Sequence, residues 1–212
     1  MFNIIPGILE KSWEEVEAKI KILSPFAKTL HVDIADGIAI NNTTFLDPKP
    51  FAKYKDQFLL EVHMMVEEPI NYLKPFADAG FKRFIGQVER MSSQEEFVAQ
   101  GQLLGEVGLA LDGPTNVEEI TVSYEDLDVV LLYVSEKMGF SGPPMLPERL
   151  EKVKAVRVKT NIPIEVDGGI RDTTIKLAKE AGANRFVATS FISMSADPRA
   201  AYEKLFSIIY EP

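Results

Sequence analysis

The feature that most constrains the fold is a regular alternation of short apolar runs with amphipathic stretches along the chain. The apolar runs are typical of buried parallel strands and lie at residues 3–9, 29–34, 58–65, 83–87, 108–112, 129–134, 164–167 and 185–188. Stretches whose apolar residues follow a helical period lie between them, at residues 13–23, 70–79, 95–104, 146–159 and 174–181. The alternation predicts eight strand-then-helix units.

Local signals support these boundaries. Glycine tolerates the left-handed conformation that closes many helices, so Gly80 and Gly182 predict helix ends. The run at 172–174, Asp-Thr-Thr, predicts a helix start. Residues 36–55 are the least regular part of the chain, and we expect a loop followed by a short helix near 50–54.

Eight β/α units predict an α/β fold, a single (β/α)8 TIM barrel that spans residues 1–212 as one domain. A content of 46% hydrophobic residues is enough for the core of such a barrel. No linker or low-complexity segment divides the chain. The doubly wound alternative is disfavoured because no glycine-rich dinucleotide fingerprint follows the first strand.

The composition excludes several function classes. A formal net charge of −9 with no block of like charges argues against nucleic-acid and anionic-membrane partners. The chain has 0 cysteines, which excludes disulfides, thiolate metal sites and thiol catalysis and fits a reducing compartment. The first residues lack the features of a signal peptide, and no apolar run is long enough to cross a bilayer. A soluble cytoplasmic protein is the expectation.

The chain contains 2 histidines, and each stands at the end of a predicted strand with a carboxylate two residues away. Side chains alternate along a strand, so His31 shares a face with Asp33, and His63 with Glu61. In a barrel, groups at the carboxyl ends of strands meet at one mouth, where Asp167 also lies. A strand histidine is more often a hydrogen-bonded core residue, and a strand-end aspartate is more often a turn residue. The paired arrangement nevertheless favours a metal site.

Three segments at these strands resemble the signature motifs of the ribulose-phosphate 3-epimerase family: HVDIADG at 31–37, EVHMMVEEP at 61–69 and EVDGGI at 165–170. The resemblance runs from PGIL at 6–9 to the Thr-Ser pair at 189–190. It implies a barrel of the ribulose-phosphate-binding type. It also implies one divalent metal ion, zinc in the first place and otherwise iron, manganese or cobalt. The implied ligands are His31, Asp33, His63 and Asp167. Glu61 is not a ligand in this family, and we expect it to support the ligands from behind.

The resemblance also implies a reaction. A proton beside the C2 carbonyl of a ketose phosphate is removed from one face and one is returned from the other, with Asp33 and Asp167 as base and acid. An acidic protein can hold the phosphate with backbone amides of glycine-rich turns at the barrel mouth. The candidate substrate- and phosphate-binding residues are Gly7, Met65, Gly139, Gly142, Gly168, Gly169, Thr189 and Ser190. A methionine on a strand is more often plain core, so Met65 has two interpretations.

Several positions depart from the family pattern. Gly7 stands where a substrate-contacting serine is usual, Ala35 and Tyr133 where methionines are, and Gln87 where a histidine is. Ser141 and Thr189 replace glycines, and the loop after the sixth strand is one residue longer.

The expected function is interconversion of ribulose 5-phosphate and xylulose 5-phosphate. The alternatives are epimerisation of a related ketose phosphate such as allulose 6-phosphate, or a non-catalytic barrel that binds metal or sugar phosphate. A homo-oligomer, dimer or hexamer, is expected from the resemblance.

Overall fold

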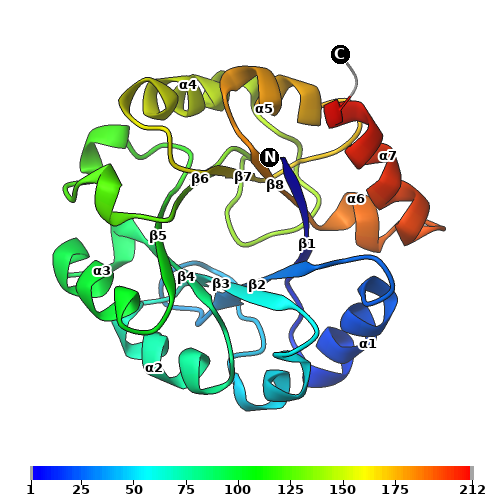
Figure 1. The fold of residues 1–212 in the computed structure, drawn as a ribbon, viewed down its shortest axis with the longest axis horizontal. Coiled ribbons are helices and arrows are strands. Elements are labelled where there is room, and N and C mark those ends of the chain that lie inside the picture. The colour runs from blue at the N-terminus through cyan, green and yellow to red at the C-terminus, as the bar shows by residue number, and fades with distance from the viewer. Residues whose placement is uncertain (1, 211–212) are drawn as a thin grey trace.

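A computed structural model describes residues 2–210 and shows a closed barrel of eight parallel strands (Figure 1). Each strand pairs with the next along the chain, and β8 pairs with β1 to close the barrel. The strands are β1 (Asn3–Ile8), β2 (Thr29–Ala35), β3 (Leu59–Met65), β4 (Arg83–Gln87), β5 (Glu106–Leu111), β6 (Val129–Tyr133), β7 (Ile164–Asp167) and β8 (Arg185–Ala188). The predicted (β/α)8 barrel is confirmed.

Helices surround the barrel (Figure 1). They are α1 (Trp13–Leu23), α2 (Ile70–Asp78), α3 (Gln94–Gln102), α4 (Leu150–Lys159), α5 (Ile175–Ala181), α6 (Ser190–Ser193) and α7 (Pro198–Tyr210). Short 3-10 turns are η1 (Lys49–Tyr54), η2 (Val88–Arg90), η3 (Val117–Glu119), η4 (Tyr124–Asp126) and η5 (Pro147–Arg149). Among residues 2–210, no helix is both long and apolar enough to span a membrane.

Local contacts fix the ends of two helices. Ser12 and Glu15 form a reciprocal capping box at the start of α1, which satisfies backbone N–H groups that lack a helical partner. Gly182 ends α5 with a φ of 113°, a conformation that favours glycine. Two connections differ from the regular unit, because β2–β3 and β5–β6 contain only 3-10 turns. The helix predicted from residue 146 begins at Leu150, since Pro147 opens a separate 3-10 turn.

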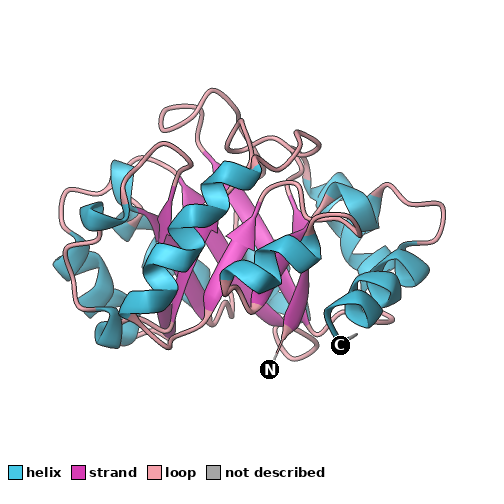
Figure 2. Ribbon diagram, turned by 90° about the horizontal axis from the view of Figure 1, so that it is seen from above, coloured by secondary structure: helices cyan, strands magenta, loops and turns pink. Residues whose placement is uncertain are grey.

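The interior of the barrel has two kinds of side chain. Ile85, Ala110, Val129 and Leu131 form an apolar cluster separate from the larger core that lies between strands and helices. Near the amino ends of the strands, the interior instead holds buried charged residues: Glu61, Arg83, Glu165 and Arg185. Figure 2 shows the strands from the side, with the N-terminus at the lower edge and long loops above the opposite edge. The carboxyl ends of the strands therefore open among these loops.

Candidate active site at the carboxyl ends of the strands

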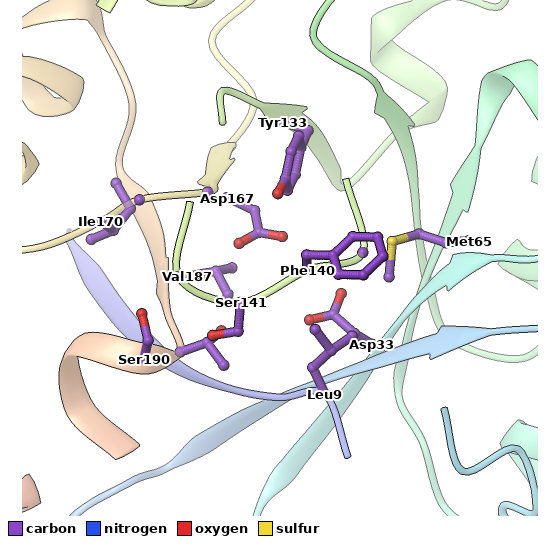
Figure 3. A pocket seen from close by; sticks show the side chains of 15 residues that line it. Leu9, Asp33, Met65, Tyr133, Phe140, Ser141, Asp167, Ile170, Val187 and Ser190 are labelled. Carbon is purple, nitrogen blue, oxygen red and sulfur yellow. The ribbon is translucent and has the colours of Figure 1, made fainter. Parts of the chain in front are cut away.

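A pocket opens at the carboxyl ends of the strands (Figure 3). Its lining consists of Leu9, Asp33, Met65, Tyr133, Gly139, Phe140, Ser141, Gly142, Asp167, Gly168, Gly169, Ile170, Val187, Thr189 and Ser190. No lysine or arginine is among these lining residues. An anion in this pocket would therefore depend on backbone amides and hydroxyl groups rather than on a cationic side chain.

Four buried side chains converge at the inner end of this pocket, and two of them, Asp33 and Asp167, line it. Ligand atoms of His31, Asp33, His63 and Asp167 all lie within 4.8 Å of one another. Asp33 Oδ1 lies 2.9 Å from His63 Nδ1 and 3.3 Å from His31 Nε2. The parallel register explains the arrangement, because it sets Asp33 on β2 directly beside His63 on β3. The structure thus brings the predicted metal ligands together.

Two buried glutamates lie beside Nδ1 of the His31 ring, on the side away from Asp33. The Nδ1 atom of His31 lies 2.9 Å from Glu61 Oε1, which accepts the proton of this nitrogen, and 3.1 Å from Glu165 Oε1. Its Nε2 is buried and has no hydrogen-bond partner among residues 2–210. A buried ring nitrogen without a hydrogen bond, directed at two aspartates, fits a cation ligand. Glu61 thus contacts a candidate ligand, and that residue is His31 rather than its strand neighbour His63.

His63 is oriented by an amide. The Gln87 side-chain nitrogen donates to Glu89 Oε2 at 2.8 Å, which turns the amide oxygen toward His63. That oxygen lies 2.9 Å from His63 Nε2 and accepts its proton, whereas Nδ1 faces Asp33 Oδ1 at 2.9 Å, on the side where a cation would bind. Glu89 Oε1 in turn accepts from the Asp112 backbone N–H at 2.8 Å. The departure at Gln87 thus preserves a polar partner for the histidine.

We predict that Gln87→Leu weakens binding of a divalent cation by about 10- to 100-fold, the usual cost of losing a partner that orients a metal ligand. Competition with a chelating dye would measure this. Gln100→Leu, on an exposed part of α3, is the matched control. Unchanged affinity in Gln87→Leu would show that His63 needs no orienting partner.

Beneath the histidines lies a buried layer of four charged residues, which we call the charged layer: Glu61, Arg83, Glu165 and Arg185. Glu61 Oε2 accepts from Arg83 Nη1 at 2.6 Å and also from Arg185. Arg185 Nε donates to Glu165 Oε2 at 2.6 Å. Burial alone would raise the pKa of Glu165, but Arg185 and His31 hold it well below its usual range. Both glutamates therefore accept hydrogen bonds from the arginines of this layer.

The two aspartates differ in proton affinity. Burial opposes ionisation of both, but the His31 charge lowers the pKa of Asp33 to about 2. Burial and the nearby Asp33 carboxylate together raise the pKa of Asp167 to about 7. Figure 3 shows the two carboxyl groups facing each other across the pocket. A pair of carboxyls with separated pKa values is suited to one group accepting a proton and the other donating one.

Glycine backbones form the side of the pocket opposite β2. Gly168 and Gly169 have φ angles of 105° and 70°. A Cβ at Gly168 would lie 2.7 Å from the Ser135 backbone nitrogen, and one at Gly169 would lie 2.8 Å from Met145 Cα. Only glycine fits these two positions. Gly139, Gly142, Ser190 and Met65 also line the pocket, as expected. Gly7 alone of the predicted binding residues does not line it.

The loop after β6 crosses the pocket and is tied at both sides. The Tyr133 hydroxyl donates to the Lys137 carbonyl at 2.8 Å, and the Asn42 amide donates to the Gly139 carbonyl at 2.6 Å. These contacts set Phe140 and Ser141 over the pocket (Figure 3). Tyr133 therefore has a structural role in positioning this longer loop, which the sequence did not reveal.

Comparison with known proteins shows which family this chain belongs to. A sequence profile of the ribulose-phosphate 3 epimerase family matches residues 3–193. The chain is 34% identical to the cytoplasmic isoform of ribulose-phosphate 3-epimerase from Oryza sativa subsp. japonica, over 92% of this chain and 89% of that protein. It is 31% identical to ribulose-phosphate 3-epimerase from Bacillus subtilis (strain 168), over 97% and 98%.

A structural relative is 3-keto-L-gulonate-6-phosphate decarboxylase from Vibrio cholerae O1 biovar El Tor, with a TM-score of 0.75 and 13% identity over 100% of this chain and 99% of that one. At this identity the likeness supports the barrel fold alone. The family profile matches nearly the whole chain, and this match does not depend on the structural likeness. The two epimerases named above are also aligned over nearly the whole chain. The chain belongs to the ribulose-phosphate 3-epimerase family.

Proposed function

We propose that this protein is a metal-dependent sugar-phosphate 3-epimerase that interconverts ribulose 5-phosphate and xylulose 5-phosphate. The observation that carries the proposal is the pair Asp33 and Asp167, whose carboxyl groups face each other across the pocket beside two buried histidines. A protein that only binds a sugar phosphate has no need for two opposed carboxyls with different proton affinities.

The two aspartates move the proton. Asp33, ionised at neutral pH, takes the proton from C3 on one face of the substrate. Asp167, which holds a proton more readily, returns one to C3 on the other face. The product differs from the substrate only in configuration at C3, and the two residues exchange roles in the reverse reaction.

The residues that would hold the metal ion are His31 through Nε2, His63 through Nδ1, and the carboxylates of Asp33 and Asp167. Two imidazoles and two carboxylates suit zinc, and they also accommodate iron, manganese or cobalt. When bound, the ion supplies Lewis-acid stabilisation of the negative charge that develops on the sugar oxygens. We expect about one divalent ion per chain.

The phosphate would lie against the glycine backbones of Gly139, Gly142, Gly168 and Gly169, with Thr189 and Ser190 beside them. These segments follow β6, β7 and β8, where barrels of this class commonly hold a phosphate. Backbone N–H groups supply the positive potential that a chain with a net charge of −9 otherwise lacks.

The packing around Gly7 favours a pentose phosphate over a hexose phosphate. Loss of a side chain at residue 7 would enlarge the pocket if nothing replaced it. The Thr189 side chain fills that space, with its Cβ only 3.2 Å from the place of a residue-7 Cβ. This departure from the family pattern therefore gives no extra room for a sixth carbon.

We expect the metal-loaded protein to wash solvent deuterium into C3 of ribulose 5-phosphate, with allulose 6-phosphate exchanging more slowly in a parallel assay followed by NMR. Faster exchange of allulose 6-phosphate would reassign the substrate. Exchange of neither compound would favour the non-catalytic barrel. A homo-oligomeric state and a cytoplasmic location stay predictions, and light scattering of the purified protein tests the first.

A further inference from the structure

Two of the departures from the family pattern, Gly7 and Thr189, are in contact. In the β1–β8 pairing Pro6 lies opposite Ala188, so the next residue on each side brings Gly7 and Thr189 together. On its other side Gly7 pairs with His31 of β2. Parallel partners in register point to the same face, so position 7 faces the interior of the barrel, as His31 does.

The contact leaves no space for a side chain on residue 7. A Cβ atom there would overlap Thr189 Oγ1 and would lie 3.3 Å from Val187 Cγ1. The Thr189 hydroxyl thus occupies the interior position that a short side chain on β1 would otherwise take. Gly7 is the residue that permits this, because any Cβ would displace the threonine.

The Thr189 hydroxyl is free to bind a ligand. Thr189 lines the pocket together with Asp33 and Ser190, and its hydroxyl makes no hydrogen bond within residues 2–210. The position of this hydroxyl indicates which part of a ligand it would contact. The cluster of candidate metal ligands lies toward β2, and the proposed phosphate site lies toward β8. The oxygens of a ketose phosphate held between these two places come within reach of this hydroxyl.

We infer that Gly7 and Thr189 together form a sugar-binding site. Thr189, at the end of β8, supplies the hydroxyl on the side of the pocket next to β1, where Gly7 has no side chain. The Thr189 hydroxyl hydrogen-bonds an oxygen of the sugar between its phosphate and its reacting carbons. Gly7 contributes the space. This inference rests on the proposed function for the identity of the ligand, a ketopentose phosphate.

Two variants of Thr189 separate the hydroxyl from the shape of the side chain. Thr189→Val keeps the volume above Gly7 and removes the hydroxyl. We expect it to weaken binding of ribulose 5-phosphate to the metal-loaded protein by about 2- to 12-fold, the range for loss of one neutral hydrogen bond. Thr189→Ser keeps the hydroxyl, so its affinity for ribulose 5-phosphate is expected to fall less than that of Thr189→Val. Isothermal titration measures binding without requiring turnover, and thermal unfolding checks the fold.

A double-mutant cycle tests the contact with Gly7. Gly7→Ser alone forces an overlap with Thr189, so it should weaken binding more than Thr189→Val does and lower the melting temperature. Thr189→Gly alone should weaken binding through loss of the hydroxyl. The double variant Gly7→Ser/Thr189→Gly removes the overlap and returns a hydroxyl to the pocket wall. It should therefore bind more tightly and melt higher than Gly7→Ser.

Three outcomes would overturn the inference. They are equal binding by Thr189→Val and the unmodified protein, additive effects of Gly7→Ser and Thr189→Gly, or an unmodified protein that does not bind ribulose 5-phosphate. The last result would overturn the proposed function as well. The first two, obtained while the unmodified protein exchanges the C3 proton, would leave the proposed function intact and refute only the role of this pair.

Discussion

Replacing Asp33 or Asp167 by asparagine should lower the rate of C3 proton exchange by about 10²- to 10⁴-fold, the range for loss of a positioned acid or base. Asparagine keeps nearly the same shape but cannot hold or release a proton at neutral pH. Both aspartates are buried, so water cannot easily take over their role. Deuterium wash-in followed by NMR, with metal content measured in parallel, gives the result.

Two controls make this test specific. Asp172→Asn changes a carboxylate paired with Lys204 at the surface, away from the pocket lining, and should exchange at the rate of the unmodified protein. Because the aspartates are also candidate metal ligands, each variant is compared at saturating metal. Exchange at the unmodified rate in either Asp33→Asn or Asp167→Asn would refute the assignment of the two carboxyls.

Replacing Glu61 by alanine should lower the free energy of unfolding by about 3–5 kcal/mol, the cost of removing one partner from a buried ion pair. Glu61 accepts from both Arg83 and Arg185, and all three side chains are at most 10% exposed. Among residues 2–210, loss of Glu61 leaves Arg83 paired with the partly exposed Glu106 and Arg185 paired with Glu165. Urea unfolding at fixed pH measures the change.

The charge and the shape of Glu61 can be separated. Glu61→Gln keeps the volume and should destabilise the protein less than Glu61→Ala, which provides a measurable variant if the alanine form does not fold. Glu203→Ala removes an exposed partner of Arg199 on α7 and should leave the unfolding midpoint unchanged. An unfolding midpoint of Glu61→Ala equal to that of the unmodified protein would mean that the charged layer adds nothing to stability.

The strands and the four converging residues could be predicted from sequence because each depends on a short local pattern. His31 and Asp33 are two apart on one strand, and a barrel brings all strand ends to one mouth. Alternation could also have indicated Glu165, since it shares a face with Asp167. Glu61 was expected to support the ligands, but the sequence did not reveal that Glu165 lies beside His31 or that Gln87 contacts His63, because those contacts join different strands.

Other features depend on packing that no local pattern records. Thr189 and Gly7 are far apart in sequence, and only the closure of β8 on β1 brings them into contact. The role of Tyr133 depends on the path of the longer loop after β6. In each case a tertiary contact, not a propensity, decides the structure.

The charged layer also bears on how readily this scaffold could acquire new substrates. Its two glutamates and two arginines balance in formal charge and lie toward the amino ends of the strands, whereas the loops that cover the pocket leave the carboxyl ends. Changes to the loop after β6 therefore leave the ion pairs of the interior in place. Mutational libraries confined to Lys137, Met138, Phe140 and Ser141 should therefore retain folded protein in most members, which allows selection to act on substrate choice.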